Sequence, residues 1–282
     1  MQLSRRDAIK AFATGAAAVA GAAAFGGGAA HAAPGGLGTL VDYSAGIPSP
    51  ASIREAGHKG VIRYCSEARA PWMAKPMRAD EAAAMHAAGL AVVSCYQYGK
   101  DETSDWHGGF DAGVQHARRG LELHRAAGGP ADRPIYMSID SNPSRQQFDT
   151  QVLPFLQGCE SVLGHAGTGI YANAPTIDWA IAAGLGAYFW QHNWGSDGRV
   201  HPAAHIHQTR IDKDKIDGIG VDLNSILKAD YGQWSTAGAP AASPAVVPAA
   251  TSAPAPAASE SEQRIAQIAR EAVQYARSTM GS

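Results

Sequence analysis

The sequence is poor in cysteine and, beyond residue 32, has no long apolar run. Its three cysteines, Cys65, Cys95 and Cys159, are an odd number, which argues against a disulfide framework. We expect them to be small buried residues, with a bridge between Cys65 and Cys95 as the alternative. No stretch after residue 32 reaches the ~20 apolar residues that span a bilayer, so no transmembrane anchor is expected in the mature chain.

Basic runs and glycine-rich phosphate loops are also missing, and the chain has a formal net charge of −2. A mildly acidic protein without a basic patch is a poor candidate for binding nucleic acid. Because both common phosphate-loop motifs are absent, a nucleotide role is disfavoured and no cofactor is predicted. Several histidines lack a recognised zinc-ligand spacing, so no metal site is predicted, and a metal-dependent hydrolase stays a third functional alternative. These histidines are His192, His201, His205 and His207.

Residues 1–32 are predicted to form a signal peptide of the twin-arginine type. Ser4–Lys10 reads SRRDAIK, an Ala/Gly-rich apolar stretch follows, and Ala30–Ala32 fits a small-x-small cleavage site. An uncleaved anchor is the alternative, and the lack of a nearby cysteine argues against a lipoprotein. Cleavage would remove a net charge of +2, so the −2 of the whole chain becomes −4. The mature protein is expected to be secreted or associated with the cell wall.

Residues 37–234 alternate between predicted strands and helices, which indicates an α/β domain. The order of elements favours a small (β/α)8 TIM-like barrel with one helix missing between strands six and seven. A doubly wound open sheet is the alternative fold, and a monomer is expected. A short last helix is predicted at Ser225–Tyr231. The predicted strands are Thr39–Gly46, Gly60–Ser66, Leu90–Tyr98, Pro134–Asn142, Thr168–Asn173, Ala187–Trp194, His205–Thr209 and Gly218–Asn224.

The composition changes abruptly after Trp234. Residues 235–258 are almost entirely Ala, Pro, Ser, Gly and Thr, which predicts a disordered Pro/Ala-rich linker. Residues 259–282 have the pattern of one amphipathic helix, with Ile265, Ile268 and Val273 on the apolar face. A lone helix cannot form a core, so it either docks elsewhere or is a vestige.

The segment Pro134–Asn142 is the clearest strand signal in the chain, because apolar and polar side chains alternate along it with a period of two. Asp140 falls at its carboxyl end, where Pro143 stops the strand. A carboxylate there is costly to bury without a purpose or a partner, and this end of the strand is where α/β folds build their active sites. A structural aspartate that caps the next helix is the alternative. Ile135, Met137 and Ile139 face one side, and Tyr136, Ser138 and Asp140 face the other.

Four carboxylates are candidate catalytic groups: Asp42, Glu67, Asp140 and Asp222 fall at the ends of predicted strands one, two, four and eight. In a closed barrel these ends converge on one mouth, where like charges raise pKa values and suit general acid–base chemistry. Glycoside hydrolysis needs two such groups, one to protonate the leaving oxygen and one to act as base, nucleophile or charge stabiliser. Helix capping or salt bridges are the alternative, with Arg63, Arg69 and Arg210 as the partners.

Aromatic side chains that could stack on sugar rings lie close to these carboxylates in the sequence, and two amides complete the set of candidate substrate-binding residues. Packing in the core is the alternative role for each aromatic. The candidates are Tyr43, Tyr96, Tyr98, Asn142, Tyr171, Trp190 and Gln208.

Five short motifs occur in an order that resembles the family-twenty-five glycoside hydrolases, which are lysozyme-like muramidases with a small (β/α) barrel. The chain is more similar still to a family of exported glycoside-hydrolase-like domains of unknown function from actinobacteria, which combine a twin-arginine signal with this barrel. The resemblance implies a polysaccharide or peptidoglycan of the cell wall as partner. The motifs are VDYS at Val41–Ser44, PIYMSIDSN at Pro134–Asn142, YFWQHNW at Tyr188–Trp194, HIHQT at His205–Thr209 and GVDLN at Gly220–Asn224.

The muramidase pattern carries over only in part. Asp42, Asp140 and Asp222 match its aspartates, but the glutamate that serves the muramidases as general acid falls on Asn142. An amide cannot donate a proton usefully at neutral pH. Either Glu67 or Asp140 supplies the acid, or the protein is a catalytically silent glycan-binding or wall-associated protein. A glycosidase acting on cell-wall glycan and such a binder are therefore the two leading hypotheses.

Overall fold

The computed structural model describes residues 36–234. The predicted signal peptide, linker and C-terminal helix, residues 1–32, 235–258 and 259–282, lie outside the described residues. Within residues 36–234, no helix combines the length and the apolar character that crossing a membrane would require.

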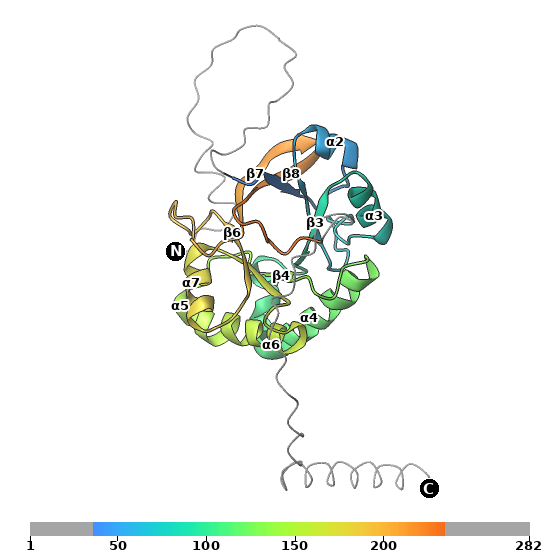
Figure 1. Ribbon diagram of the computed structural model, residues 1–282. Helices are drawn as coiled ribbons and strands as arrows, with labels where there is room; N and C mark the ends of the chain where they lie inside the picture. The colour runs from blue at the N-terminus through green and yellow to red at the C-terminus, as the bar shows by residue number, and fades with distance from the viewer. Residues whose placement is uncertain (1–35, 235–282) are drawn as a thin grey trace, which may run out of the picture. The chain divides into compact units, whose positions relative to one another are not determined.

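A closed barrel of eight strands stands at the centre of the domain, and each strand pairs with its neighbours in sequence (Figure 1). Strands β1 to β7 run parallel, whereas β8 runs antiparallel to both β7 and β1 and closes the ring. The barrel is therefore a mixed one. The strands are β1 Thr39–Asp42, β2 Gly60–Tyr64, β3 Ala91–Tyr96, β4 Ile135–Ser138, β5 Thr168–Ala172, β6 Tyr188–His192, β7 Ile206–Ile216 and β8 Ile219–Ile226.

The last two strands correct the predicted (β/α)8 pattern, because β8 is antiparallel, and they correct two further predictions. Strand β7 does not stop at Thr209 but continues to Ile216, and Asp217 and Gly218 then form a two-residue turn with φ values of 51° and 76°. Asp-Gly with both φ values positive is the preferred turn of a tight hairpin, so no helix separates β7 from β8. The predicted helix at Ser225–Tyr231 is also wrong, because β8 continues to Ile226. The chain then bends until the amide of Trp234 reaches the carbonyl of Val92, at 2.8 Å.

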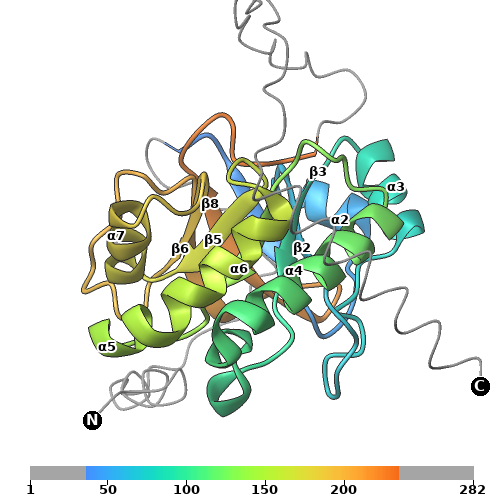
Figure 2. The same cartoon turned by 90° about the horizontal axis from the view of Figure 1, so that it is seen from below.

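Helices cover the outside of the barrel where parallel strands need crossover connections (Figures 1 and 2). Their starts follow local signals: the Ser49 hydroxyl caps α2 and the Asn173 amide caps α7, and each helix has proline in its first turn. Residues 193–205, between β6 and β7, form turns without a helix. The helices are α2 Pro50–Glu55, α3 Ala79–Ala87, α4 Gly109–Ala126, α5 Arg145–Gln147, α6 Leu153–Leu163 and α7 Ala174–Ala182, with short irregular turns η1 Asp101–Thr103, η2 Asp105–Gly108 and η3 Phe148–Val152.

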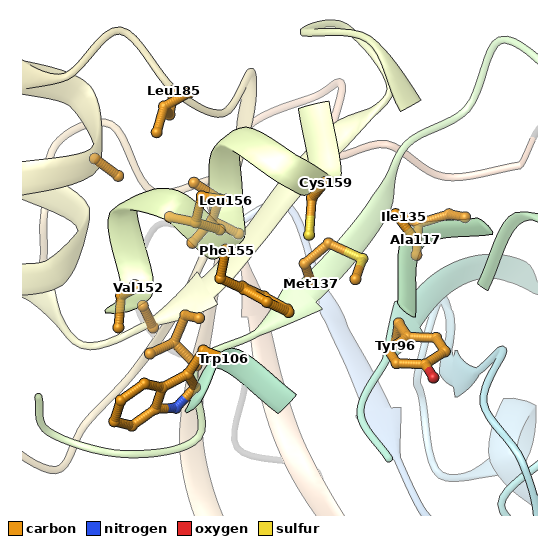
Figure 3. Packing of buried hydrophobic residues seen from close by; sticks show 14 of the residues in the cluster. Tyr96, Trp106, Ala117, Ile135, Met137, Val152, Phe155, Leu156, Cys159 and Leu185 are labelled. Atoms are coloured by element: carbon orange, nitrogen blue, oxygen red, sulfur yellow. The ribbon is translucent and has the colours of Figure 1, made fainter. Parts of the chain in front are cut away.

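The hydrophobic core has an inner part inside the barrel and an outer part between strands and helices. Figure 3 shows the outer part beside α6, where Met137 of β4 packs with Phe155 and Cys159. Helices α4 and α6 lie side by side, because glycines remove the side chains at their contact (Figure 2). A Cβ added at Gly113 would stand 2.1 Å from the Phe155 carbonyl oxygen, and one at Gly158 would stand 2.2 Å from that of Phe110.

Cys65 and Cys95 are buried free thiols, so the alternative of a bridge between them is not realised. Their side chains face opposite sides of the barrel wall, Cys65 in the outer core and Cys95 in the inner one. The Cys65 thiol donates to the Cys95 carbonyl at 3.2 Å, and burial raises the pKa of Cys65 to about 12. Both are therefore small packing residues.

Candidate active site at the barrel mouth

A cavity of about 390 Å³ opens at the end of the barrel where β1 to β4 have their carboxyl ends. We call it the central cavity. Its walls come from the segments that follow these four strands and from the β7–β8 hairpin. Five aspartates line it: Asp42, Asp101, Asp140, Asp212 and Asp222. Its other polar and aromatic side chains include Tyr64, Trp72, Lys75, Gln97, Tyr98 and Lys100.

Asp42 lies on the inner face of β1 and is only 4 % exposed. Its Oδ2 accepts hydrogen bonds from Gln208 Nε2 at 2.9 Å and from Asn224 Nδ2 at 2.8 Å. Residues of the inner core orient both amides. The Tyr171 hydroxyl donates to Gln208 Oε1 at 2.7 Å, and the Trp190 indole donates to Asn224 Oδ1 at 2.8 Å. The carboxylate is therefore held by donors that cannot turn away without losing their own partners.

Asp222 stands directly opposite Asp42, since the two residues are paired in the register of β1 and β8. It accepts a hydrogen bond from the backbone amide of Asp212 at 2.8 Å and a longer one from Gln208 Nε2 at 3.3 Å. Because β8 is antiparallel, Asp222 lies near the beginning of its strand and not at the end. The predicted position at the mouth is correct, but the predicted strand direction is wrong.

Asp140 lies two residues beyond β4, the strand next to β3, and lines the central cavity. Its Oδ2 accepts a hydrogen bond from Gln97 Nε2 at 2.9 Å. The predicted alternation of this strand holds: Met137 packs in the outer core and Tyr136 in the inner one. Asp42, Asp140 and Asp222 are thus brought to one cavity by strands that are remote in sequence.

Glu67 is not brought to this cavity. It receives a hydrogen bond from Arg119 Nε of α4 at 2.5 Å, and the two side chains are 46 % and 43 % exposed. It lines a separate depression on the outer surface, together with Tyr96 and His116. The prediction that Glu67 joins the other carboxylates at the mouth is wrong, because the arginine holds it on the helix side.

The three arginines that the alternative interpretation named as partners of the candidate carboxylates contact other groups. Buried Arg63 donates from Nε to Glu81 at 2.5 Å, and exposed Arg210 pairs with Asp214 at 2.7 Å. Arg69 instead donates to the Tyr98 carbonyl at 3.2 Å.

Two of the predicted substrate-binding aromatics, Tyr43 and Tyr96, belong to the outer core. Tyr43 turns toward α3, where its hydroxyl donates to Glu81 at 3.1 Å, and burial raises its pKa. Its ring packs in the outer core, although its backbone borders the central cavity. Tyr96 packs beneath α4 (Figure 3), and its hydroxyl lies 2.8 Å from His116 Nδ1. Neither ring can stack on a sugar at the mouth, since each faces the helix layer.

The remaining candidates divide between the cavity and the layer beneath it. Tyr98 lines the central cavity and is half-exposed. Tyr171, Trp190 and Gln208 are buried inside the barrel, where they support the carboxylates. Asn142 accepts a hydrogen bond from Asn173 at 3.0 Å and is not among the residues that line the central cavity.

Several residues of the site were missed by the sequence analysis. Asn224, which is buried beneath the cavity and donates to Asp42, could have been found, because it lies two residues after Asp222 and therefore on the same face of β8. Lys75 and Trp72 lie in the irregular segment between β2 and α3, where no periodicity marks them. Lys100 belongs to a loop that buried Asp105 organises by accepting from the amides of Tyr98 and Gly99.

Lys75 is the one strongly buried cation in this wall, at 5 % exposure. Its Nζ lies over the Tyr64 ring, 4.7 Å from the centroid. Burial lowers the pKa of Lys75 from its ordinary value of 10.5 to about 8, because the ammonium group loses hydration. As for metals, no group of three or more His, Cys, Asp or Glu within residues 36–234 is arranged to hold an ion.

Comparison with known proteins identifies the family. The family model described as "Rv2525c-like, glycoside hydrolase-like domain" matches residues 51–226. The Mycobacterium tuberculosis protein named "Putative peptidoglycan hydrolase Rv2525c" is 56 % identical over 240 residues, covering 83 % of this chain and all of the relative. The crystal structure of the Tat-secreted Rv2525c in complex with L-tartrate is 58 % identical, with a TM-score of 0.70, and covers 71 % of this chain and all of that one.

A bacterial lysozyme from Streptomyces coelicolor is a more distant likeness, at 18 % identity and a TM-score of 0.46, covering 69 % of this chain and 93 % of the lysozyme. Likeness at that level carries no conclusion about activity. The family model spans most of the described barrel and the mycobacterial relative is matched over its whole length. The chain belongs to the Rv2525c-like family of glycoside hydrolase-like domains.

Proposed function

We propose that this protein acts on cell-wall glycan, peptidoglycan or a related polysaccharide, and that it hydrolyses O-glycosyl bonds in the central cavity. The observation that carries the proposal is the convergence of Asp42, Asp140 and Asp222 on one cavity from β1, β4 and β8. The name of the mycobacterial relative, "Putative peptidoglycan hydrolase Rv2525c", supports the same class of substrate. The family's description as glycoside hydrolase-like supports the same class of reaction.

The three aspartates differ in their surroundings, and this suggests their roles. Asp140 is the general acid that protonates the leaving oxygen, because Glu67 lies elsewhere and Asn142 carries no proton to give. Asp222 is more exposed than Asp42, so it is the better placed to meet water or the sugar as base or nucleophile. Asp42, held by two oriented amides, stabilises the positive charge that develops on the sugar ring.

A second function, glycan binding without cleavage, is favoured by one observation. The position that carries the acid in the muramidase pattern is Asn142, and its amide is engaged with Asn173 at 3.0 Å. A binder would use the same cavity, with Tyr98 as its stacking surface and the aspartates as acceptors for sugar hydroxyls.

The experiment that separates the two functions measures glycan release from purified cell wall, with sedimentation binding beside it. Asp140→Asn keeps the shape of the side chain and removes its acid function, so turnover should fall at least ~10²-fold while binding survives. Asp132→Asn, at an exposed surface position, is the matched control and should keep full turnover. Binding without turnover in the wild type would establish the silent binder, and turnover that persists in Asp140→Asn would place the chemistry elsewhere.

We also propose that residues 1–32 direct export through the twin-arginine pathway and that the mature protein is secreted or wall-associated. The SRRDAIK motif at Ser4–Lys10 supports this. The mycobacterial relative, described as Tat-secreted, supports it as well.

A further inference from the structure

Two lysines of the central cavity lie on the same indole ring. Lys75 Nζ is 5.9 Å and Lys100 Nζ is 5.8 Å from the centroid of Trp72. Both side chains line the cavity, and we call them the lysine pair. Contacts of this kind between cations and aromatic faces restrict where the ammonium groups can go. The pair is therefore a built feature of the wall formed by the segments after β2 and β3.

Lys75 is buried without a direct ion pair, although Asp105 and Asp140 act on it at longer range. Within residues 36–234, the contacts of the two ammonium groups are with aromatic rings, Tyr64 and Trp72 for Lys75 and Trp72 for Lys100, and not with a carboxylate. Lys75 as a residue is 5 % exposed, and a lysine buried to that extent costs free energy unless an anion compensates for the lost water. Because Lys75 lies at the wall of an open cavity, a ligand that carries an anionic group can lower this free-energy cost when it binds.

We propose that the lysine pair is an anion subsite, which takes the carboxylate of an acidic sugar in the glycan that occupies the central cavity. This inference rests on the proposed function, and it names the substrate class. Peptide-free muramic acid carries a carboxylate on its ether substituent, and a uronic acid carries one on the exocyclic carbon of its ring, so both are pyranoses with one negative charge. The Trp72 and Tyr98 side chains line the same wall and provide apolar surface for that ring.

The charge of the cavity favours a carboxylate over a phosphate. Five aspartates face two lysines there, so the cavity has a formal excess of negative charge. A monovalent carboxylate that contacts the lysine pair meets less repulsion from these aspartates than a divalent phosphate would. Neutral glycans would leave Lys75 uncompensated.

The test is calorimetric titration with tetrasaccharides that differ in one group. The first alternates N-acetylglucosamine with peptide-free N-acetylmuramic acid, and the second is the same sugar with its carboxyl groups reduced to alcohols. Wild-type protein should bind the acidic form roughly tenfold more tightly, as expected for a hydrogen bond to a charged group. Lys75→Met should abolish the preference, and Lys59→Met, an exposed lysine outside the cavity, should preserve it.

A pH series on the wild type gives a second readout that needs no variant. The preference for the acidic sugar should fade as the pH rises through about 8, because Lys75 then loses its charge. Burial raises the pKa of Tyr64 and of Cys95 well above their usual ranges, so neither of these neighbours titrates in that interval. The charged and titratable groups around Lys75 are Tyr64, Arg69, Cys95, Lys100, Asp105 and Asp140.

Each outcome bears on one proposal or on both. Equal binding of the acidic and reduced sugars would overturn the subsite while leaving glycan binding in place. Binding of neither sugar would overturn the proposed function and the subsite together. Tighter binding of a glycerol-phosphate oligomer than of the acidic sugar would overturn the choice of a carboxylate. A tetrasaccharide that contains glucuronic acid distinguishes the two sources, since equal affinity would show that the lysine pair reads the carboxylate and not the muramic ether.

Discussion

Replacing Lys75 by methionine should make the protein more stable at pH 7. The fall of the Lys75 pKa from 10.5 to about 8 corresponds to a penalty of about 3 kcal/mol for the buried charge. Methionine has a similar volume and no charge, but it loses the cation–π contact with Tyr64, which is worth about 1–2 kcal/mol. The net gain should be about 1–2 kcal/mol, or roughly 3–6 °C in Tm for a domain of this size.

The stability advantage of Lys75→Met over the wild type should depend on pH. A lysine whose pKa is lower in the folded than in the unfolded state destabilises the fold fully below the folded pKa. Between pH 8 and 10.5 the folded lysine is neutral while the unfolded one still binds a proton, so the penalty disappears as the pH rises. The advantage of Lys75→Met should therefore shrink from pH 7 to pH 10.

Urea denaturation of wild type and Lys75→Met at pH 7 and pH 10 measures both effects, with Lys59→Met as a control that should change neither. The reasoning would be refuted if Lys75→Met proved less stable than the wild type at pH 7 by an amount that did not change with pH. Lys75 would then be a structural residue of the cavity wall, and its burial would need no ligand to explain it.

Three further outcomes follow from the contacts described above. Glu67→Gln should leave turnover and Tm nearly unchanged, because its partner arginine is exposed and surface ion pairs contribute little; a turnover assay that falls with this variant would restore Glu67 as an acid. Gln208→Leu should cost ~2–4 kcal/mol in urea denaturation, since Asp42 and Asp222 both lose a buried donor; a loss near zero would show that the amide is dispensable. Changing Arg5 and Arg6 to Lys should leave the precursor in the cytoplasm, and unchanged export in cell fractionation would end the twin-arginine interpretation.

Local periodicity was enough to predict the inward carboxylates. In a strand, successive side chains point to opposite faces, so Asp140 can be assigned to the inner face from its alternation with Met137 and Ile139 alone. The same reasoning places Asp222 between outward Val221 and Leu223. The barrel also follows from local information, because alternating strand and helix patterns leave few ways to bury their apolar faces.

The tertiary structure decided which of these residues share a site. Glu67 follows β2 by three residues, much as Asp140 follows β4 by two, yet it pairs with Arg119, which is 52 residues away, and lies outside the mouth. Lys75 reaches the cavity from an irregular segment, where side-chain direction depends on packing and not on a repeat. Periodicity reports the direction of a side chain relative to its own strand, whereas ion pairs and loop positions depend on distant parts of the chain. For that reason the sequence by itself determined the inward direction of the aspartates and favoured a barrel. Only the fold decided that the barrel closes through an antiparallel β8, that a buried lysine joins the aspartates and that Glu67 does not.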